Sequence, residues 1–359
     1  MTNERSVPDP NTVERIEQVL SGNRRALARL LTEIESESEG IEHVLAALFS
    51  HTGRAWIIGI TGAPGTGKST LVTALAKAYR AANRTVAIVA VDPTSPFTGG
   101  AILGDRIRMR DLSGDSGVFI RSMATRGSLG GLARATRDAV RALDAAGFNI
   151  VLVETVGAGQ SEVDIARMAN TTVVVEAPGL GDDVQAIKAG ILEIADVLVI
   201  NKADRPGVNT TLRALRTMLE LGHPSSRAQL NGSQIRHHGK TMTAQTPTAH
   251  PTNHTTAPLW IPPIIQTVAS EDKGIDELVN AIEAHRAHLH ANEIFAEIER
   301  RQIEIELYDR LRESLMNQLI KSLPEETFND LVRRVQTREV APQHAVRTLL
   351  HEASGRGVP

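Results

Sequence analysis

The sequence contains no cysteine among its 359 residues. Disulfides, iron–sulfur clusters, thiolate zinc sites and cysteine nucleophiles are therefore excluded. Aromatic residues are scarce as well, at 3% of the chain, which argues against base-stacking platforms and aromatic cation cages. Charge of one sign is also lacking, because 39 Lys and Arg against 42 Asp and Glu leave a formal net charge of -3. Such a balance gives no field that would attract nucleic acid or an anionic membrane surface.

Long apolar runs are missing too. No stretch approaches the roughly 18 residues that a membrane-spanning helix needs, and short pieces such as residues 86–91 have the length of a strand. The first ten residues carry acidic side chains and prolines where a secretory signal has an apolar stretch. We therefore expect a cytoplasmic protein that has neither a membrane nor a nucleic acid as a partner.

The length predicts two to three structural units at roughly 150 residues per domain. Apolar residues recur at helical spacing before residue 52, as at Leu27, Leu30 and Leu31, and predict an N-terminal helical segment over residues 1–52. Helical spacing returns after Gly274 and continues to the end. Residues 291–359 are predicted to be a C-terminal helical segment with one apolar face, which a second copy of the chain would cover in a homodimer.

Between these flanks, residues 53–290 alternate apolar, β-branched segments with helical ones. This order predicts a doubly wound α/β domain whose mostly parallel sheet is covered on both faces. The predicted strands are residues 55–60, 85–92, 117–122, 149–155, 171–177, 195–201 and 264–269. Residues 225–258 hold seven Thr, four His and no acidic residue, so we expect a flexible insertion there.

A glycine-rich motif follows the first predicted strand and opens a helix. It reads Gly62-Ala-Pro-Gly-Thr-Gly-Lys-Ser69 and matches G-x-x-x-x-G-K-[ST], the phosphate-binding P-loop. Backbone N–H groups of such a loop point at phosphate oxygens, the Lys68 amine reaches the β- and γ-phosphates, and the Ser69 hydroxyl binds Mg²⁺. The predicted nucleotide contacts here are Gly62, Ala63, Pro64, Gly65, Thr66, Gly67, Lys68, Ser69 and Thr70.

A second motif, Asn201-Lys202-Ala-Asp204, comes directly after a later strand. A fixed carboxylate at Asp204 can accept hydrogen bonds from N1–H and the 2-amino group of guanine, whereas adenine has no donor at either position. The motif therefore favours guanine. Ala269 and Ser270, at the end of the last strand, occupy the place where GTPases close over the base with a backbone amide.

Three carboxylates stand where a Mg²⁺–triphosphate needs them. Asp92 and Glu154 end strands, and Asp105 lies in the glycine-rich loop after the second strand. Carboxylates beside the phosphates can hold Mg²⁺ directly or through water, and the Gly157 amide can bond the γ-phosphate. With Lys68, these three residues are the predicted catalytic group.

Together these segments resemble the MeaB/ArgK GTPases, the bacterial proteins associated with methylmalonyl-CoA mutase. The resemblance also rests on Val91-Asp-Pro-Thr-Ser95, residues 98–109, Leu129-Gly-Gly131 and residues 153–161, and it covers roughly residues 15–350. It implies a P-loop GTPase that hydrolyses GTP slowly, gates adenosylcobalamin delivery to a methylmalonyl-CoA mutase and protects that enzyme, with the cobalamin held by the partner.

The resemblance also implies roles for particular residues. The Mg²⁺ and γ-phosphate-sensing positions of the family fall on Ser69, Asp92, Asp105 and Glu154. A switch segment that relays the nucleotide state to the mutase falls on residues 178–188, including Asp182, Gln185 and Lys188. Members of the family dimerise through their C-terminal helices.

Two other functions stay open at this point. Relatives have been labelled kinases of an arginine/ornithine transport system, but a kinase needs a nearby base and an acceptor pocket, and the sequence indicates neither. A nickel-insertion GTPase normally carries Cys or His ligands in its switch region, and the absence of cysteine weighs against it.

Overall fold

The computed structural model describes residues 10–93, 109–112, 114–125, 131–155, 161–179, 194–221 and 259–355. The chain divides into two compact units, residues 1–295 and 296–359, and each is described by itself. None of the helices in the described residues is long and apolar enough to cross a bilayer.

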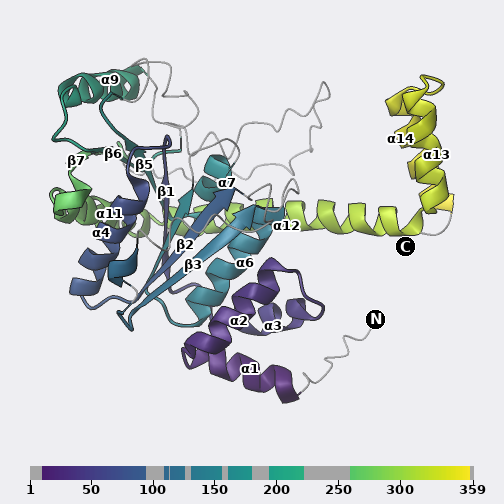
Figure 1. Cartoon of the computed structure of the whole chain (residues 1–359), viewed down its shortest axis with the longest axis horizontal. Coiled ribbons are helices and arrows are strands. Elements are labelled where there is room, and N and C mark those ends of the chain that lie inside the picture. The colour runs from purple at the N-terminus through teal and green to yellow at the C-terminus, as the bar shows by residue number, and fades with distance from the viewer. Residues whose placement is uncertain are drawn as a thin grey trace. The chain divides into compact units, whose positions relative to one another are not determined.

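A parallel sheet forms the centre of the first unit (Figure 1). Within the described residues it has seven strands, in the spatial order β3-β2-β4-β1-β5-β6-β7, and each pairing is parallel. The central strands β4, β5 and β6 are buried along their whole length, as expected for strands covered on both faces. The predicted doubly wound α/β fold is confirmed. The bounds are β1 Trp56–Thr61, β2 Val86–Pro93, β3 Val118–Thr125, β4 Ile150–Thr155, β5 Thr171–Glu176, β6 Val197–Asn201 and β7 Ile264–Thr267.

Helices cover both faces of the sheet (Figure 1). On one face lie α4 (Lys68–Ala81) and α11 (Ile275–Ala291), which also contact each other. On the other face lie α6 (Gly131–Ala145), α7 (Ser161–Met168) and α9 (Val208–Leu221). Two short 3-10 turns, η1 (Arg110–Leu112) and η2 (Ala269–Glu271), lie in the connections.

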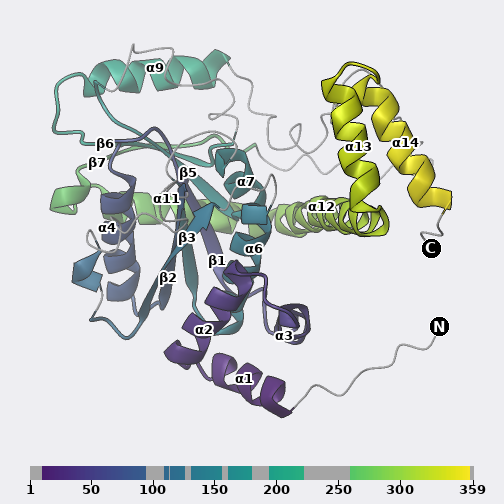
Figure 2. The same cartoon turned by 45° about the vertical axis from the view of Figure 1, so that its right-hand side comes forward.

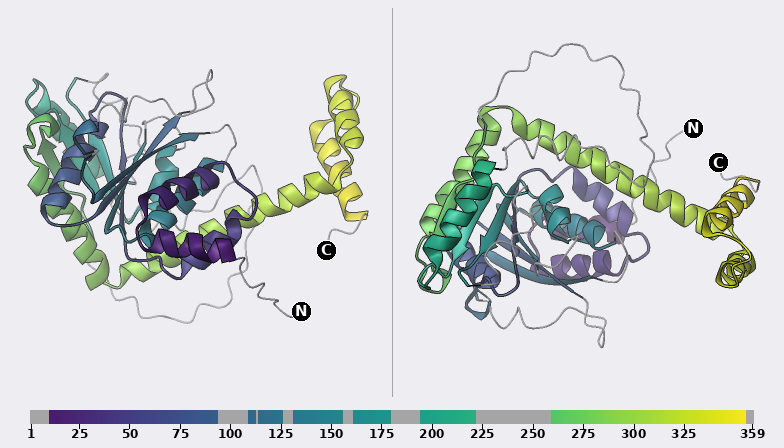
Figure 3. Two further views of the ribbon diagram at one scale, coloured as in Figure 1. Left: turned by 60° about the horizontal axis from the view of Figure 1, so that its bottom comes forward. Right: turned by 90° about the horizontal axis from the view of Figure 1, so that it is seen from above.

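Three short N-terminal helices form a further layer on α6 (Figure 3, left). They are α1 (Pro10–Leu20), α2 (Arg24–Glu35) and α3 (Ile41–Phe49). The Asn23 side chain caps α2 by accepting hydrogen bonds from two of its first backbone N–H groups. Leu27, Leu30, Leu31 and Ile34 are buried, so the predicted apolar stripe faces the core.

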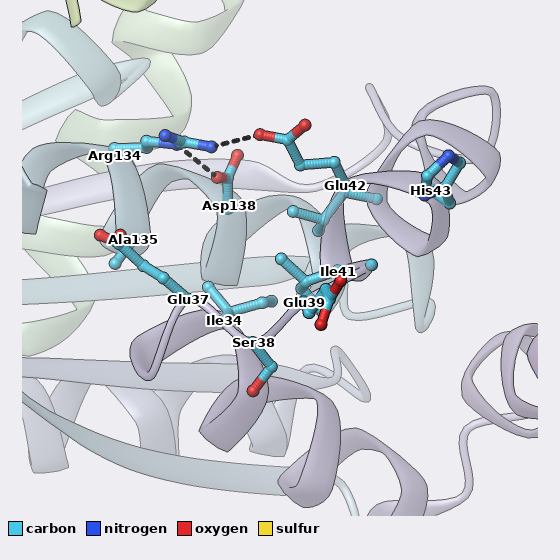
Figure 4. Close-up of a pocket in the computed structure, with 12 residues that line it drawn as sticks. Ile34, Glu37, Ser38, Glu39, Ile41, Glu42, His43, Arg134, Ala135 and Asp138 are labelled. Atoms are coloured by element: carbon cyan, nitrogen blue, oxygen red, sulfur yellow. Dashed lines mark hydrogen bonds and ion pairs between the residues drawn. The ribbon is translucent and has the colours of Figure 1, made fainter. Parts of the chain in front are cut away.

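An ion-pair cluster lines a pocket of about 270 Å³ where α3 meets α6 (Figure 4). Arg134 of α6 donates to Glu42 of α3 at 2.8 Å and lies 3.9 Å from Asp138 on its own helix. Ile34 and Ile41 are buried beside this cluster. The N-terminal helices are therefore attached to α6 by charge as well as by apolar contact.

Two tryptophans pack around α11 at the amino-terminal edge of the sheet. Trp56, the first residue of β1, stacks on Phe295 with 5.5 Å between ring centroids, and the Arg286 guanidinium lies 4.9 Å from the centre of its ring. Trp260 lies just before β7, and its ring centroid is 5.0 Å from that of His285 and 5.2 Å from that of His288.

A buried polar chain runs beneath these rings. The Trp56 indole N–H donates to Thr171 Oγ1 at 3.0 Å, and this oxygen lies 3.0 Å from His285 Nδ1. His285 Nε2 lies 3.5 Å from Asp196 Oδ1, and the other Asp196 oxygen accepts the Thr172 N–H at 2.7 Å. These contacts tie the starts of β1, β5 and β6 to α11.

The second unit is helical. It contains α12 (Ile294–Ser322) from residue 296 onward, α13 (Glu325–Gln336) and α14 (Pro342–Gly355), and α13 and α14 lie side by side (Figure 2). Apolar side chains recur every fourth residue along α12 and are at least 42% exposed: Ile303, Leu307, Leu311 and Leu315. Phe328, Val332, Val346 and Leu350 are exposed on α13 and α14.

Candidate functional site

The P-loop connects the end of β1 to the start of α4, as the motif predicts. Gly67, in a left-handed conformation with φ +92°, precedes the first helical residue. The Lys68 amine turns back into the loop and donates to the carbonyl oxygens of Gly62 at 2.8 Å and Ala63 at 3.0 Å. A single buried cation thus sits inside the curve of the loop, beside the N-terminus of a helix whose partial charge is positive.

Two glycines of this loop leave no room for a side chain. Gly62 has φ +137°, and a Cβ placed on it would lie 2.0 Å from the carbonyl oxygen of Val175 in β5. A Cβ on Gly67 would lie 2.5 Å from the Asn201 amide nitrogen. The loop can therefore approach the neighbouring strand and the second motif only because these positions are glycine.

Ser69, the second residue of α4, meets Glu154 of β4, the strand next to β1. Glu154 of β4 is the register partner of Ile60 in β1, one residue before that strand ends. Its Oε1 accepts the Ser69 hydroxyl at 2.7 Å, and the Glu154 side chain is 6% exposed. A hydroxyl and a carboxylate are oxygen ligands of the kind that Mg²⁺ prefers, so these two residues fit that ion as part of its octahedral shell.

The second motif contacts the P-loop directly. Asn201, the last residue of β6, donates from Nδ2 to the Thr66 carbonyl oxygen at 2.8 Å. Lys202, in a left-handed conformation with φ +58°, donates to the Gly65 carbonyl oxygen at 2.6 Å. The two sequence motifs, about 135 residues apart, therefore form one site at the carboxyl edge of the sheet.

A third segment completes this arrangement. Thr267 of β7 is the register partner of Asn201, and its hydroxyl donates to Asn201 Oδ1 at 3.1 Å. The Ala269 backbone N–H reaches the same oxygen at 3.2 Å. Sequence reasoning named Ala269 and Ser270 but missed Thr267, although a hydroxyl residue that ends the strand next to Asn201 was a signal for it.

Asp204 lies at the exposed side of this loop. The Lys273 amine makes an ion pair with Glu271 at 2.6 Å. This hydrogen bond, with a smaller contribution from Asp204, raises the pKa of Lys273 above its ordinary value. A positive charge therefore stays beside the two carboxylates throughout the neutral pH range.

Several predicted residues lie outside the described part of the chain. Asp92 belongs to β2, but its side chain is not described. The others are Asp105, Gly157, Asp182, Gln185, Lys188 and the insertion 225–258. Their roles stay predictions.

Comparison with known families gives a direct match. The sequence model described as "Methylmalonyl Co-A mutase-associated GTPase MeaB" matches residues 27–323. The chain belongs to this family. As a MeaB-family GTPase, it hydrolyses GTP to GDP and phosphate.

Individual relatives agree with this assignment to the MeaB family. A protein of Pyrococcus abyssi whose name describes it as a GTPase is 44% identical over 345 residues, covering 96% of this chain and 98% of the relative. The mitochondrial methylmalonic aciduria type A homolog of Caenorhabditis elegans is 37% identical over 211 residues, covering 55% of this chain and 53% of the relative. The first match spans the helical flanks as well as the sheet.

A solved structure shares the MeaB-family fold. The crystal structure of an LAO/AO transport system kinase superposes with a TM-score of 0.63 at 24% identity, covering 96% of this chain and 98% of that chain. A likeness at this identity shows the fold alone. The likeness therefore gives no information about kinase activity in this chain.

Proposed function

We propose that the site binds GTP with the P-loop around the phosphates and with Asn201, Lys202 and Asp204 at the guanine. The observation that carries the proposal is the direct hydrogen bonding of the two motifs, through the Thr66 and Gly65 carbonyl oxygens. The P-loop contacts are those predicted from the sequence, residues 62–70, with Glu154 and Gly157 at the γ-phosphate end and Ala269 and Ser270 over the base. Because Asp204 is exposed, a base edge can reach its carboxylate. Asn201 is buried and holds the motif against the P-loop.

Mg²⁺ fits the same site. Ser69 and Glu154 would hold it, together with Asp92 and Asp105, and it would neutralise charge on the β- and γ-phosphates. The Lys68 amine lies within the loop, where it can contact the same phosphates. Positioning and charge stabilisation by these groups are the catalytic contribution that phosphoryl transfer to water requires.

The proposed output is a conformational state read by a partner enzyme. We infer a G-protein chaperone that gates adenosylcobalamin loading of a methylmalonyl-CoA mutase-type enzyme and protects it in the cytoplasm. The description of the family and the name of the Caenorhabditis elegans relative support this role. The relay residues proposed for it are Asp182, Gln185 and Lys188, and the cobalamin belongs to the partner.

A homodimer is part of the proposal. The exposed apolar side chains at every fourth position of α12 would lose contact with water in an interface between two copies. Burying such side chains is worth about 25 cal/mol per Å² of apolar surface before the cost of association. A second copy of the chain has the same stripe and is therefore a complementary partner.

The test is a nucleotide-dependent binding experiment. The immobilised chain is mixed with a purified cobalamin-dependent methylmalonyl-CoA mutase in GTP, in GDP and in a non-hydrolysable GTP analogue. We expect the amount of mutase retained to depend on the nucleotide, and the Lys68→Ala variant to lose that dependence. Equal retention in all three nucleotides and with the variant would contradict the proposed coupling.

A further inference from the structure

Asn201 is held at both ends of its side-chain amide. Nδ2 donates to the Thr66 carbonyl oxygen at 2.8 Å, while Oδ1 accepts from the Thr267 hydroxyl at 3.1 Å and from the Ala269 N–H at 3.2 Å. Asn201 is 2% exposed and Thr267 is 1% exposed, so water cannot readily replace the Thr267 hydroxyl as a donor to Oδ1. This amide links the P-loop to the segment over the base.

Guanine binding requires one of these donors, the Ala269 N–H, for a different hydrogen bond. The proposed function, on which this inference rests, gives the Ala269 N–H to the guanine base, and the acceptor that guanine presents to an amide there is O6. A backbone N–H makes one well-aligned hydrogen bond at a time. The N–H that now reaches Asn201 Oδ1 is therefore the same one that the base requires.

We propose that Thr267 is a positioning residue that keeps Asn201 in place when the base takes the Ala269 N–H. With the Thr267 hydroxyl still donating, Oδ1 remains satisfied and Nδ2 stays on the Thr66 carbonyl oxygen. Without it, guanine binding leaves a buried carbonyl oxygen with no donor, which carries the full cost of an unsatisfied polar group. Thr267 thus supports base recognition without touching the nucleotide.

Close packing around Asn201 prevents its amide from moving to another hydrogen-bond partner. A Cβ on Gly67 would lie 2.5 Å from Asn201 Nδ2, so the amide is pressed against the P-loop and has little space to shift. The register pairing of Asn201 with Thr267 keeps the hydroxyl beside Oδ1. The hydroxyl and the amide are therefore matched by two adjacent strands rather than by a flexible loop.

The first experiment compares two substitutions at one position. Thr267→Val keeps the shape and removes the hydroxyl, and Thr267→Ser keeps the hydroxyl. Calorimetry with GDP should give a Kd about five- to tenfold higher for the valine variant, the value of one buried hydrogen bond, and within about twofold of wild type for the serine variant. Unchanged GDP affinity in the valine variant would overturn the inference.

Base analogues separate this role from a merely structural one. The quantity compared is the valine penalty, which is the Kd of the Thr267→Val variant divided by the Kd of wild type. Inosine diphosphate keeps O6 and should show the same valine penalty as GDP. The diphosphate of 2-aminopurine riboside has no O6, leaves the Ala269 N–H on Asn201, and should show a penalty below about twofold. Its lost contact to Asp204 affects both proteins equally and cancels in the ratio.

The outcomes distinguish the two proposals. An equal valine penalty for all three nucleotides would overturn the inference and indicate general destabilisation of the site. A wild-type protein with no preference for GDP over ADP would overturn the guanine site itself and this inference with it. A clear GDP preference without a valine penalty would overturn only the role of Thr267.

Discussion

At the scale of single residues, base recognition and phosphate binding share side chains. Asn201 and Lys202 come from the guanine motif, yet both donate to P-loop carbonyl oxygens. The Lys68 amine bonds two further carbonyls of the same loop. The loop conformation therefore depends on residues far from it in sequence, and a change at the base end should reach the phosphate end.

The exposed carboxylate of Asp204 gives a prediction about base choice. In Asp204→Asn the amide oxygen can still accept the N1–H, but the amide N–H₂ would face the 2-amino group of guanine, so two donors meet, whereas xanthine presents a carbonyl oxygen at that position. We expect GTP affinity to fall by about a hundredfold or more and XTP to become the preferred nucleotide. Competition binding with GTP and XTP measures this, and an unchanged GTP preference would refute the base assignment.

The sequence predicted those site residues that lie in contiguous motifs. The residues from Gly62 to Ser69 could be assigned because glycine spacing and a following helix are local properties of the chain. Ser69 and Glu154 were also assigned to one Mg²⁺ site, but the hydrogen bond from Thr267 to Asn201 was missed, because it depends on which strands become neighbours. Strand order is decided by packing over the whole sheet, and periodicity does not report it.

At the scale of elements, a bidentate ion pair attaches the segment that precedes β3 to the helix α4. Arg80, near the end of α4, donates to both Asp115 carboxylate oxygens, at 2.9 and 3.0 Å. Asp115 also accepts the Gly117 N–H at 2.7 Å. These hydrogen bonds, that from Arg80 first, hold the pKa of Asp115 below its ordinary value.

A pH dependence of stability follows from the lowered pKa of Asp115. Its ionised form favours the folded state, so this contribution is present above the ordinary pKa of 3.8 and is lost as the pH falls through the lowered pKa of the folded protein. We expect Asp115→Asn to lower Tm at pH 7 and the difference from wild type to narrow at about pH 3.

The same α4 connection offers a matched control. Lys77 and Asp111 form an ion pair at 3.3 Å, and the Asp111 side chain is 73% exposed. Such pairs contribute little to stability, so Asp111→Asn should leave Tm nearly unchanged at both pH values. A Tm loss at pH 7 that is equal for the two variants would contradict a special role for Asp115.

Element type was predictable where element contacts were not. Alternating β-branched and helical segments predicted all seven strands to within a few residues, and the apolar stripe of α2 predicted its buried face. The chain from Trp56 to Asp196 through His285 had no sequence signal, because its members come from four separate segments. A histidine in a helix pattern does not indicate which strand its ring will meet.

At the scale of the whole molecule, the boundary between the compact units follows Phe295. We predict that a chain ending at Phe295 is a monomer in solution scattering, whereas the full chain is a dimer. Phe295 is retained because it stacks on Trp56, and its loss would uncover that ring. GDP affinity should stay within about twofold of the full chain, since the site residues lie in the first unit.

The outcome that would contradict this prediction is equally direct. A truncated chain that remains dimeric would show that the interface lies in the first unit. A truncated chain that is monomeric but has lost GDP binding would show that the second unit supports the nucleotide site. Scattering and calorimetry on the same sample distinguish these cases.

The two tryptophans also make the molecule its own optical reporter. The sequence has only two, and both indoles pack around α11 at the edge of the sheet opposite the P-loop. Intrinsic fluorescence excited at the indole band therefore senses α11 rather than the base or the phosphates. A spectral shift on adding GDP to the wild-type chain would mean that nucleotide binding at the P-loop edge changes the surroundings of α11, the helix that leads into α12. The measurement needs no added label.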